Sequence, residues 1–512
     1  MKFARITVTA LALIATGAQA QSASSFTIVA NPLPPSADLV TEAREAWRVR
    51  DRVKLGQARQ MALDQQHPLA PWFDYWELNN RLSEATQPEL NAFYARWPGS
   101  YVEDRLRNDW LLELGRRRDW TNFKRDLAAY KMQDDREVTC YTLLADPPAK
   151  ELRDTARAAW LGQRDSDEGC NLMAATLVQA GTLKEADVWR KMRLVVEGNR
   201  PRAIKQTGAL LSKAASDAVA ELMDKPDRYL KRKAAAKPRA SAELTTLALM
   251  RLAAQDPDAA TDALQSWAPK LPDDLAAWAW AQLARQNAIR LQDVASEQFE
   301  RALRLQTKAG GTMDWSDDTL AWMARAALRA GNGAGKPDQL LTAISLMKPG
   351  DQRDITWQYW RAKARQSLAA PGAEGDGQRR EAQEALRAIA SPLSFYGKLA
   401  ADELKLRLPL PPQPADLTPQ ERAQGLAFPG VQRAMLLLAV GLRSEGQREW
   451  NFSMRGLNDR ELLAVAQAAC ERELWERCIS TSERTRQEID LNQRFPMPYR
   501  ADVLRQATAA GL

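Results

Sequence analysis

The sequence predicts an all-α protein: an irregular α-solenoid, or superhelical ring of helical hairpins, followed by a small helical linker domain. Ala, Leu, Arg, Gln and Glu dominate most segments, β-branched runs are scarce, and Gly and Pro fall mostly between periodic stretches. Amphipathic segments of about 12 to 16 residues, joined by short turns, are typical of stacked helices.

A recurring Trp–Ala pair supports the solenoid. Residues at positions i and i+4 share one face of a helix, and the spacings of 42 and 38 residues between successive pairs suit one helical hairpin per repeat. Such regular placement favours inter-helix core for most of the 17 tryptophans, rather than aromatic platforms for sugar binding. The three pairs are Trp280 with Ala284, Trp322 with Ala326 and Trp360 with Ala364.

The first 20 residues have the pattern of a secretory signal peptide. Lys2 and Arg5 form a basic start, "ITVTALALIATGA" is a short apolar core, and Ala18-Gln19-Ala20 is a cleavage site before Gln21. The apolar run is too short to span a bilayer, and no later run approaches that length. We therefore expect a periplasmic protein whose mature chain has no transmembrane segment.

The composition excludes several kinds of chemistry. His67 is the only histidine, so a multi-His metal site or a Ser-His-Asp triad is not expected. Its position before a proline at a helix boundary predicts a surface or capping role. No glycine-rich phosphate loop is present, and we expect neither cofactor nor metal. Removing Lys2 and Arg5 lowers the formal charge from +7 to +5, which suits an anionic polymer, although nucleic acid is not expected behind a signal peptide.

Four cysteines in an exported chain are compatible with two disulfides. Cys140 and Cys170 lie in neighbouring helical segments and form the natural pair. Cys470 and Cys478 would lie about 12 Å apart on one continuous helix, which is too far for a bond. They can pair only if the chain turns near residues 472–474.

Two breaks divide the chain. Residues 371–377, "PGAEGDG", predict a flexible loop, and residues 406–420 contain five prolines and form a connector that cannot be helical in its first half. The connector separates a superhelical domain over residues 21–405 from a helical linker domain over residues 421–493. In the final stretch, residues 494–512, Tyr499, Val503 and Leu504 have helical spacing and Gly511 is placed to end the helix.

Several longer motifs resemble the soluble lytic murein transglycosylase family. They are "HPLAPWFDYWEL" (67–78), "RWPGSYVEDRLRNDWLLELGRRRDW" (96–120), "WQYWRAKA" (357–364), "SPLSFYGKLAADEL" (391–404), "FPGVQRAMLLLAVGLRSEGQREW" (428–450) and "RFPMPY" (494–499). Each motif is loose, but their order covers almost the whole mature chain. The resemblance implies a superhelical scaffold, a linker domain and then a lysozyme-like catalytic domain.

The resemblance also implies a reaction, cleavage of the MurNAc–GlcNAc bond of peptidoglycan to leave 1,6-anhydroMurNAc ends. In the family one glutamic acid serves as acid and then as base, unlike the usual two-carboxylate arrangement. Its Glu-Ser signature and the Gly-Leu-Met-Gln stretch that follows are both absent from this sequence. We therefore expect residues 494–512 to be the truncated start of a catalytic domain, and the chain as given to be inactive.

No substitute catalytic site emerges from the remaining acids. Glu42, Glu45, Asp134 and Asp135 fall on predicted helix surfaces or in turns, and none is assigned a catalytic role. The expected partners are peptidoglycan glycan strands. The alternative is a non-catalytic periplasmic scaffold that binds peptidoglycan or cell-wall synthesis enzymes on a concave helical surface.

Overall fold

The computed structural model describes residues 37–148, 150–311, 313–331 and 335–512. The predicted signal peptide, residues 1–20, lies outside the described residues. Within them the secondary structure is helical throughout, and no β-strand occurs there. The prediction of an all-α fold is therefore confirmed.

Five helices of the N-terminal part start at a side-chain cap. The side chains of Asp51, Ser100, Asp119, Asp135 and Asp167 each accept a backbone N–H group of the following helix, which satisfies donors that a helix leaves free in its first turn. The elements of this part are α1 (Ala37–Val49), α2 (Arg52–Asp64), α3 (Ala70–Asn80), η1 (Leu82–Glu84), α4 (Gln87–Arg96), α5 (Tyr101–Arg117), α6 (Trp120–Leu127), α7 (Arg136–Ala145), α8 (Leu152–Gly162) and α9 (Glu168–Gln179).

The middle part contains the largest hydrophobic core. Its central helix, α16 (Asp273–Ile289), is buried on most of its surface because other helices pack around it, and it is accordingly rich in Ala, Leu and Trp. The other helices are α10 (Glu185–Glu197), α11 (Pro201–Gly208), α12 (Lys213–Asp224), α13 (Pro226–Arg232), α14 (Arg239–Gln255), α15 (Pro257–Trp267), α17 (Val294–Ala309), α18 (Asp317–Arg329) and α19 (Pro337–Leu346).

The remaining helices of the array are shorter on average, and they are followed by the connector. Residues 371–377 do not form the predicted loop: the stretch contains η3 and the start of α22, because Arg379 binds the carbonyl groups of Ala370 and Gly372 and holds the turn. These elements are α20 (Pro349–Gln352), α21 (Ile355–Leu368), η3 (Gly372–Gly375), α22 (Asp376–Ile389) and α23 (Phe395–Glu403).

After α23 the chain is extended from residue 406 to residue 418, as its prolines require. A second group of helices then follows, with its own small core around Trp450. The helices are α24 (Pro419–Ala427), α25 (Pro429–Ala439), α26 (Arg443–Ser453), α27 (Asp459–Cys470), α28 (Trp475–Ser482), α29 (Leu491–Arg494) and α30 (Arg500–Ala509).

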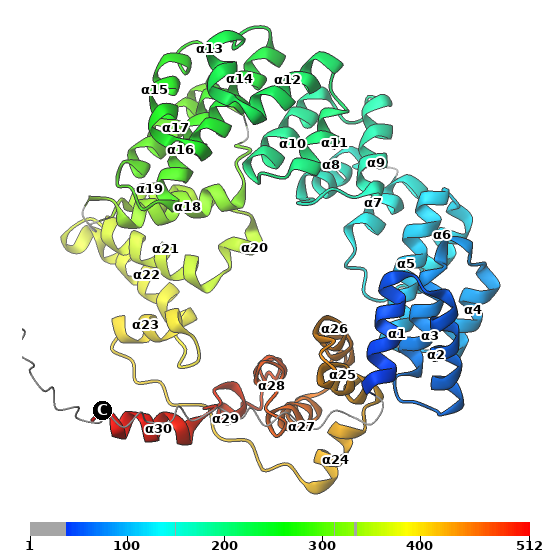
Figure 1. Ribbon diagram of the computed structural model, residues 1–512. Helices are drawn as coiled ribbons and strands as arrows, with labels where there is room; N and C mark the ends of the chain where they lie inside the picture. The colour runs from blue at the N-terminus through cyan, green and yellow to red at the C-terminus, as the bar shows by residue number, and fades with distance from the viewer. Residues whose placement is uncertain (1–36, 149, 312, 332–334) are drawn as a thin grey trace, which may run out of the picture.

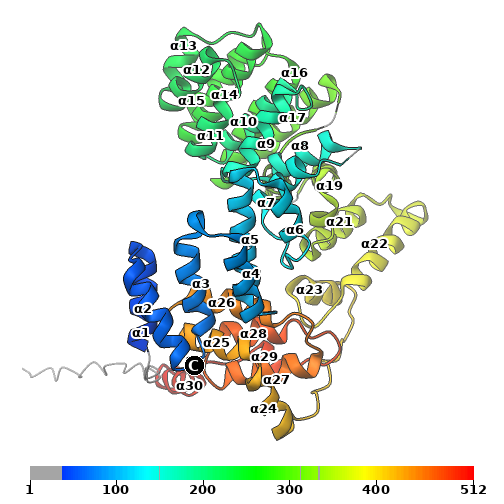
Figure 2. The same ribbon diagram turned by 90° about the vertical axis from the view of Figure 1, so that its right-hand side faces the viewer.

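The helices α1 to α23 follow one another around an open ring (Figure 1). The later group does not extend this ring outward. Instead α25 and α26 lie beside α1 and α5, so that the later group, which the connector joins to α23, closes the ring against its first helices (Figure 1). Viewed from the side, the helices α24–α29 lie together at the end of the molecule below α3–α5 (Figure 2).

Most tryptophans form core between helices, as their regular placement predicts. Trp280 is 2% exposed and Ala284 is fully buried, whereas Trp322 and Trp360 are only partly buried at the edge of the core. The tryptophans of the second and third pairs are therefore less buried than the tryptophan of the first pair. Ten of the 17 tryptophans are buried: Trp72, Trp76, Trp110, Trp160, Trp189, Trp278, Trp280, Trp315, Trp357 and Trp450.

Candidate functional site at the ring closure

One half of the ring closure comes from α3. Trp72, Phe73 and Trp76 crowd the helix and are all nearly fully buried, and a proline in the first turn fits a position whose N–H has no helical partner. Trp72 also packs against Tyr101 of α5, with ring centroids 5.7 Å apart. The indole of Trp72 is therefore packed against α5 as well as against its own helix.

The other half comes from α26, which carries a buried carboxylate. The indole Nε1–H of Trp72 donates to Oε2 of Glu449 at 2.8 Å, and the guanidinium Nε–H of Arg433 donates to Oε1 at 2.8 Å. Burial raises the pKa of Glu449, while the charge of Arg433 and the two hydrogen bonds oppose the shift. The carboxylate thus joins the later group of helices to α3, near the start of the array.

Three further contacts surround this central one. Arg44 of α1 forms a salt bridge with Glu445 of α26 at 2.8 Å, and the rings of Tyr101 and Phe452 meet edge to face at 5.7 Å. Leu437 of α25 is fully buried within the N-terminal hydrophobic cluster. Apolar packing and a buried ion pair together close the ring.

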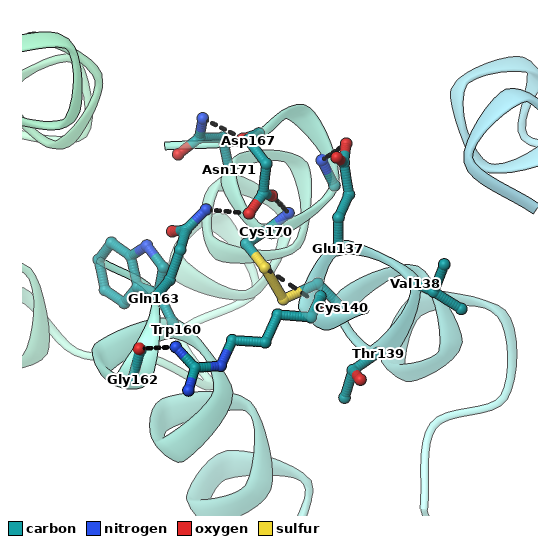
Figure 3. The surroundings of a disulfide bond; sticks show 12 residues. Glu137, Val138, Thr139, Cys140, Trp160, Gly162, Gln163, Asp167, Cys170 and Asn171 are labelled. Atoms are coloured by element: carbon teal, nitrogen blue, oxygen red, sulfur yellow. Dashed lines mark hydrogen bonds between the residues drawn. A yellow bond between two sulfur atoms is a disulfide. The ribbon is translucent and has the colours of Figure 1, made fainter. Parts of the chain in front are cut away.

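The structure contains both disulfides. Cys140 of α7 is bonded to Cys170 of α9, with the Cα atoms 4.9 Å apart. Figure 3 shows the bond between the two helices, next to Asp167, whose carboxylate accepts the N–H of Cys170 at 2.7 Å. Glu137 accepts the N–H of Gly169 at 2.9 Å from the other helix. The bond thus joins two helices that are also linked by hydrogen bonds.

Cys470 and Cys478 are bonded as well, with a Cα separation of 5.0 Å. They can meet because α27 ends at Cys470 and α28 begins at Trp475. Glu473 adopts a left-handed backbone with a φ of 57°, which reverses the chain where the sequence required a turn.

His67 lies just before α3, whose N-cap is Leu69, and it is not on the surface. Its side chain is only 9% exposed, its Nδ1 accepts the N–H of Leu69 at 3.0 Å, and its ring meets Phe73 edge to face at 5.6 Å. Burial lowers the pKa of His67. The ring packs among the buried apolar residues of α3, so the predicted surface role is wrong. The bond to Leu69 orders the turn before α3, but α3 itself has no side-chain cap.

The acids considered in the sequence do not come together. Glu42 is exposed, Glu45 pairs with Arg48, and Asp134 accepts the hydroxyl of Tyr130 at 2.9 Å. Asp135 caps α7 by accepting the N–H of Glu137 at 2.8 Å. The described residues hold no group of three or more His, Cys, Asp or Glu side chains placed to bind a metal ion.

A buried acid that the sequence did not single out is Glu197. Thr319 donates its hydroxyl to Oε1 at 3.0 Å, Ser316 binds the same oxygen, and Gln282 donates to Oε2 at 3.0 Å. Burial raises the pKa of Glu197. Because its oxygens are occupied by these side chains, the group joins three helices rather than facing a substrate, and no local motif connects the four positions.

The final segment forms a helix with no buried residue. Tyr499 precedes α30 in a left-handed conformation, and Gly511 follows it with a φ of 74°. Tyr499, Val503 and Leu504 are 70%, 60% and 54% exposed. Helix α30 therefore presents apolar side chains to solvent, and among the described residues no helix is long and apolar enough to cross a membrane.

Comparison with known proteins relates the fold to one family. The model of the soluble lytic murein transglycosylase L domain matches residues 426–487, which lie inside the predicted linker segment. No curated protein sequence matches the chain.

Among solved structures, an inactive mutant of the lytic transglycosylase Slt from Pseudomonas aeruginosa is similar with a TM-score of 0.59 and 24% identity, over 93% of this chain and 75% of that one. The 70-kDa soluble lytic transglycosylase of Escherichia coli gives 0.51 and 18% identity, over 94% of this chain and 75% of that one. A complex of the 70-kDa soluble lytic transglycosylase with bulgecin A gives 0.52 and 18%, with the same coverage. These similarities show a shared helical fold.

Proposed function

Because residues 426–487 are an L domain of the soluble lytic murein transglycosylase family and the chain shares the fold of solved lytic transglycosylases, we propose that the protein acts on the periplasmic cell wall as a peptidoglycan-binding scaffold. In this proposal residues 21–405 are the superhelical domain and residues 421–493 the linker domain. Residues 494–512 are the start of a lysozyme-like domain.

The single observation that carries the proposal is the ring closed by the L domain. A closed array fixes the curvature of its inner surface, and concave solenoid surfaces are suited to extended ligands. The formal charge, +7 for the whole chain and +5 without Lys2 and Arg5, favours association with an anionic polymer such as peptidoglycan.

We expect binding without cleavage. The 1,6-anhydro reaction of the family needs a glutamic acid that holds its proton in a desolvated cleft. The Glu-Ser signature is absent from the 512 residues, and the buried acids Glu197 and Glu449 are enclosed by protein partners.

Sedimentation with purified sacculi at low and high salt tests this function. The expected result is retention at low salt that falls at high salt, because exposed charges are screened, with no muropeptide released into the supernatant. No retention at low salt contradicts glycan binding, and release of 1,6-anhydro muropeptides contradicts the absence of catalysis. Reading the coding DNA beyond codon 512 for a Glu-Ser motif tests the assignment of residues 494–512.

The exposed apolar residues around α30 favour a second candidate, a scaffold that holds a cell-wall enzyme. Phe495 and Met497 are 55% and 69% exposed, in addition to the apolar face of α30, and contiguous apolar patches mark protein interfaces. Co-purification with lytic or synthetic cell-wall enzymes from a periplasmic extract, with and without residues 495–512, tests it. Equal recovery of such enzymes with both forms contradicts this candidate.

A further inference from the structure

A cleft of about 730 Å³ lies beside the ring closure. Its first wall is the segment between α4 and α5, which includes Trp97, together with Lys131. Its second wall belongs to the L domain and includes Phe428, Phe452 and Arg455. The cleft exists only because the closed ring brings the two walls together.

The charged groups of this cleft have one sign. Its lining contains Arg96, Lys131, Arg433 and Arg455 but neither Asp nor Glu. Arg96 pairs with the buried Asp74, which also pairs with Arg59, and Arg433 pairs with the buried Glu449. Lys131 and Arg455 are exposed, and in the described part of the chain neither forms a salt bridge. The cleft therefore offers a ligand two exposed cations that form no salt bridge within the described residues.

The backbone on the Lys131 side of the cleft is held in place by a buried carboxylate. Asp104 is 1% exposed, and its carboxylate accepts the backbone N–H groups of Lys131 and Met132 at 2.7 and 2.9 Å. Burial raises the pKa of Asp104, and the charge of Arg455 opposes the shift. Lys131 and Arg455 both line the cleft, although they come from opposite sides of the ring closure.

Aromatic rings lie next to the cations and are also held in place. The indole of Trp97 is half-buried and donates to Asp74 at 2.8 Å. The ring of Phe452 is fixed against Tyr101, and the guanidinium of Arg455 lies 4.7 Å from its centroid. Ligand sites typically combine such apolar rings with a few placed polar groups.

We propose that this cleft binds a carboxylate-bearing saccharide, with the carboxylate on Lys131 and Arg455 and the sugar rings against Trp97 and Phe452. Charge-assisted hydrogen bonds favour a carboxylate over a neutral group, and the aromatic faces provide apolar contact for a sugar ring. The inference rests on the proposed function, because peptidoglycan fragments carry both sugar rings and carboxylates, and it assigns their binding to the junction instead of the open centre of the ring.

The test is calorimetric titration of the full chain with two soluble probes, a disaccharide tetrapeptide (GlcNAc–MurNAc-tetrapeptide) and chitotetraose, which has no carboxylate. The variants are K131A, R455A and their combination, since neither side chain supports a salt bridge of the fold. The matched control is K205A, an exposed lysine of α11 outside the cleft. Thermal unfolding of each variant shows whether the fold is retained.

We expect the disaccharide tetrapeptide to bind wild type and K205A alike. The double variant should bind it roughly tenfold or more weakly, as for loss of a charged hydrogen bond. Chitotetraose should bind weakly to all five proteins. Unchanged affinity in the double variant overturns the assignment of the cleft. Equal binding of chitotetraose to wild type overturns the role of the carboxylate. If the chain is retained on sacculi but does not bind the disaccharide tetrapeptide, this inference is overturned and the proposed function stands. If the chain neither binds the disaccharide tetrapeptide nor is retained on sacculi, both the inference and the proposed function are contradicted.

Discussion

Lys191 is a buried lysine whose ammonium group has no carboxylate partner among the described residues. It donates to the carbonyl oxygens of Trp160 and Gln163 at 2.6 and 2.7 Å. Burial lowers its pKa to about 8. A neutral amine still has two N–H groups for the two carbonyls, so deprotonation relieves the cost of the buried charge without breaking this arrangement.

The sign of the pH dependence follows from this shift. In the unfolded chain the pKa of Lys191 returns to its ordinary value near 10.5, so between pH 8 and pH 10.5 the unfolded state binds more protons than the folded state. The contribution of Lys191 to stability therefore rises with pH across that window. We expect the free energy of unfolding of wild type, minus that of K191M, to increase by about 2 kcal/mol between pH 7.5 and pH 10.

Urea unfolding at a series of pH values measures this difference. The exposed Lys205, substituted in the same way as K205M, provides the control, and its difference from wild type should stay constant across the range. A wild-type-minus-K191M difference that is flat or falls with pH shows that Lys191 stays charged in the folded protein.

At the scale of the helix, the two disulfides close loops of very different length. The sequence separations are 30 residues for Cys140–Cys170 and 8 residues for Cys470–Cys478. Chain-entropy arguments give about 3.6 kcal/mol for the longer loop and about 2.5 kcal/mol for the shorter. We expect C140A/C170A to lose about 1 kcal/mol more than C470A/C478A in chemical unfolding, and the reverse order contradicts the argument from loop length.

The Trp–Ala repeat gives a second comparison between helices. Trp280 lies in the centre of the main core and is 2% exposed, so W280A should cost about 3–5 kcal/mol. Trp360 is partly buried, and its Nε1 lies 3.4 Å from the hydroxyl of Tyr396. We expect W360A to cost about half as much as W280A, and equal losses in urea unfolding contradict this ranking.

The positions of the helices were largely predictable from the sequence, but the burial of individual side chains on them was not. The i, i+4 spacing placed Trp280 and Trp360 on helices, and the eight-residue gap between Cys470 and Cys478 required the turn seen at Glu473. The difference in burial between the two tryptophans depends on how many later helices pack over each, which local spacing does not contain. The same reason explains His67, whose burial comes from the packing of α3.

At the scale of the whole molecule, the ring closure joins residues that are far apart in sequence. Trp72 and Glu449 are separated by 377 positions, and the motif "RSEGQREW" gives no sign that Glu449 is buried. The sequence predicted a solenoid and a linker domain, but only the three-dimensional path of α1 to α23 determines that the linker returns to α3 and α5. The cleft beside the closure was unpredictable for the same reason.

Glu449 should therefore control whether the ring stays closed. Substitution E449A leaves the guanidinium of Arg433 and the indole N–H of Trp72 without their shared acceptor, which for a buried pair costs about 3–5 kcal/mol. Because the loss falls on the contact between α3 and α26, we expect the L domain to separate from the N-terminal helices and the radius of gyration from small-angle X-ray scattering to increase.

Two further variants make this test specific. R44A removes the outer pair with Glu445, whose side chains are 27% and 16% exposed, and should cost about 1 kcal/mol without opening the ring. W72F keeps an aromatic ring in the core and removes one hydrogen bond to Glu449, so its effect should lie between those of R44A and E449A. If E449A retains both the wild-type radius of gyration and the wild-type unfolding midpoint, apolar packing around Leu437 and Phe452 holds the closure without the buried carboxylate.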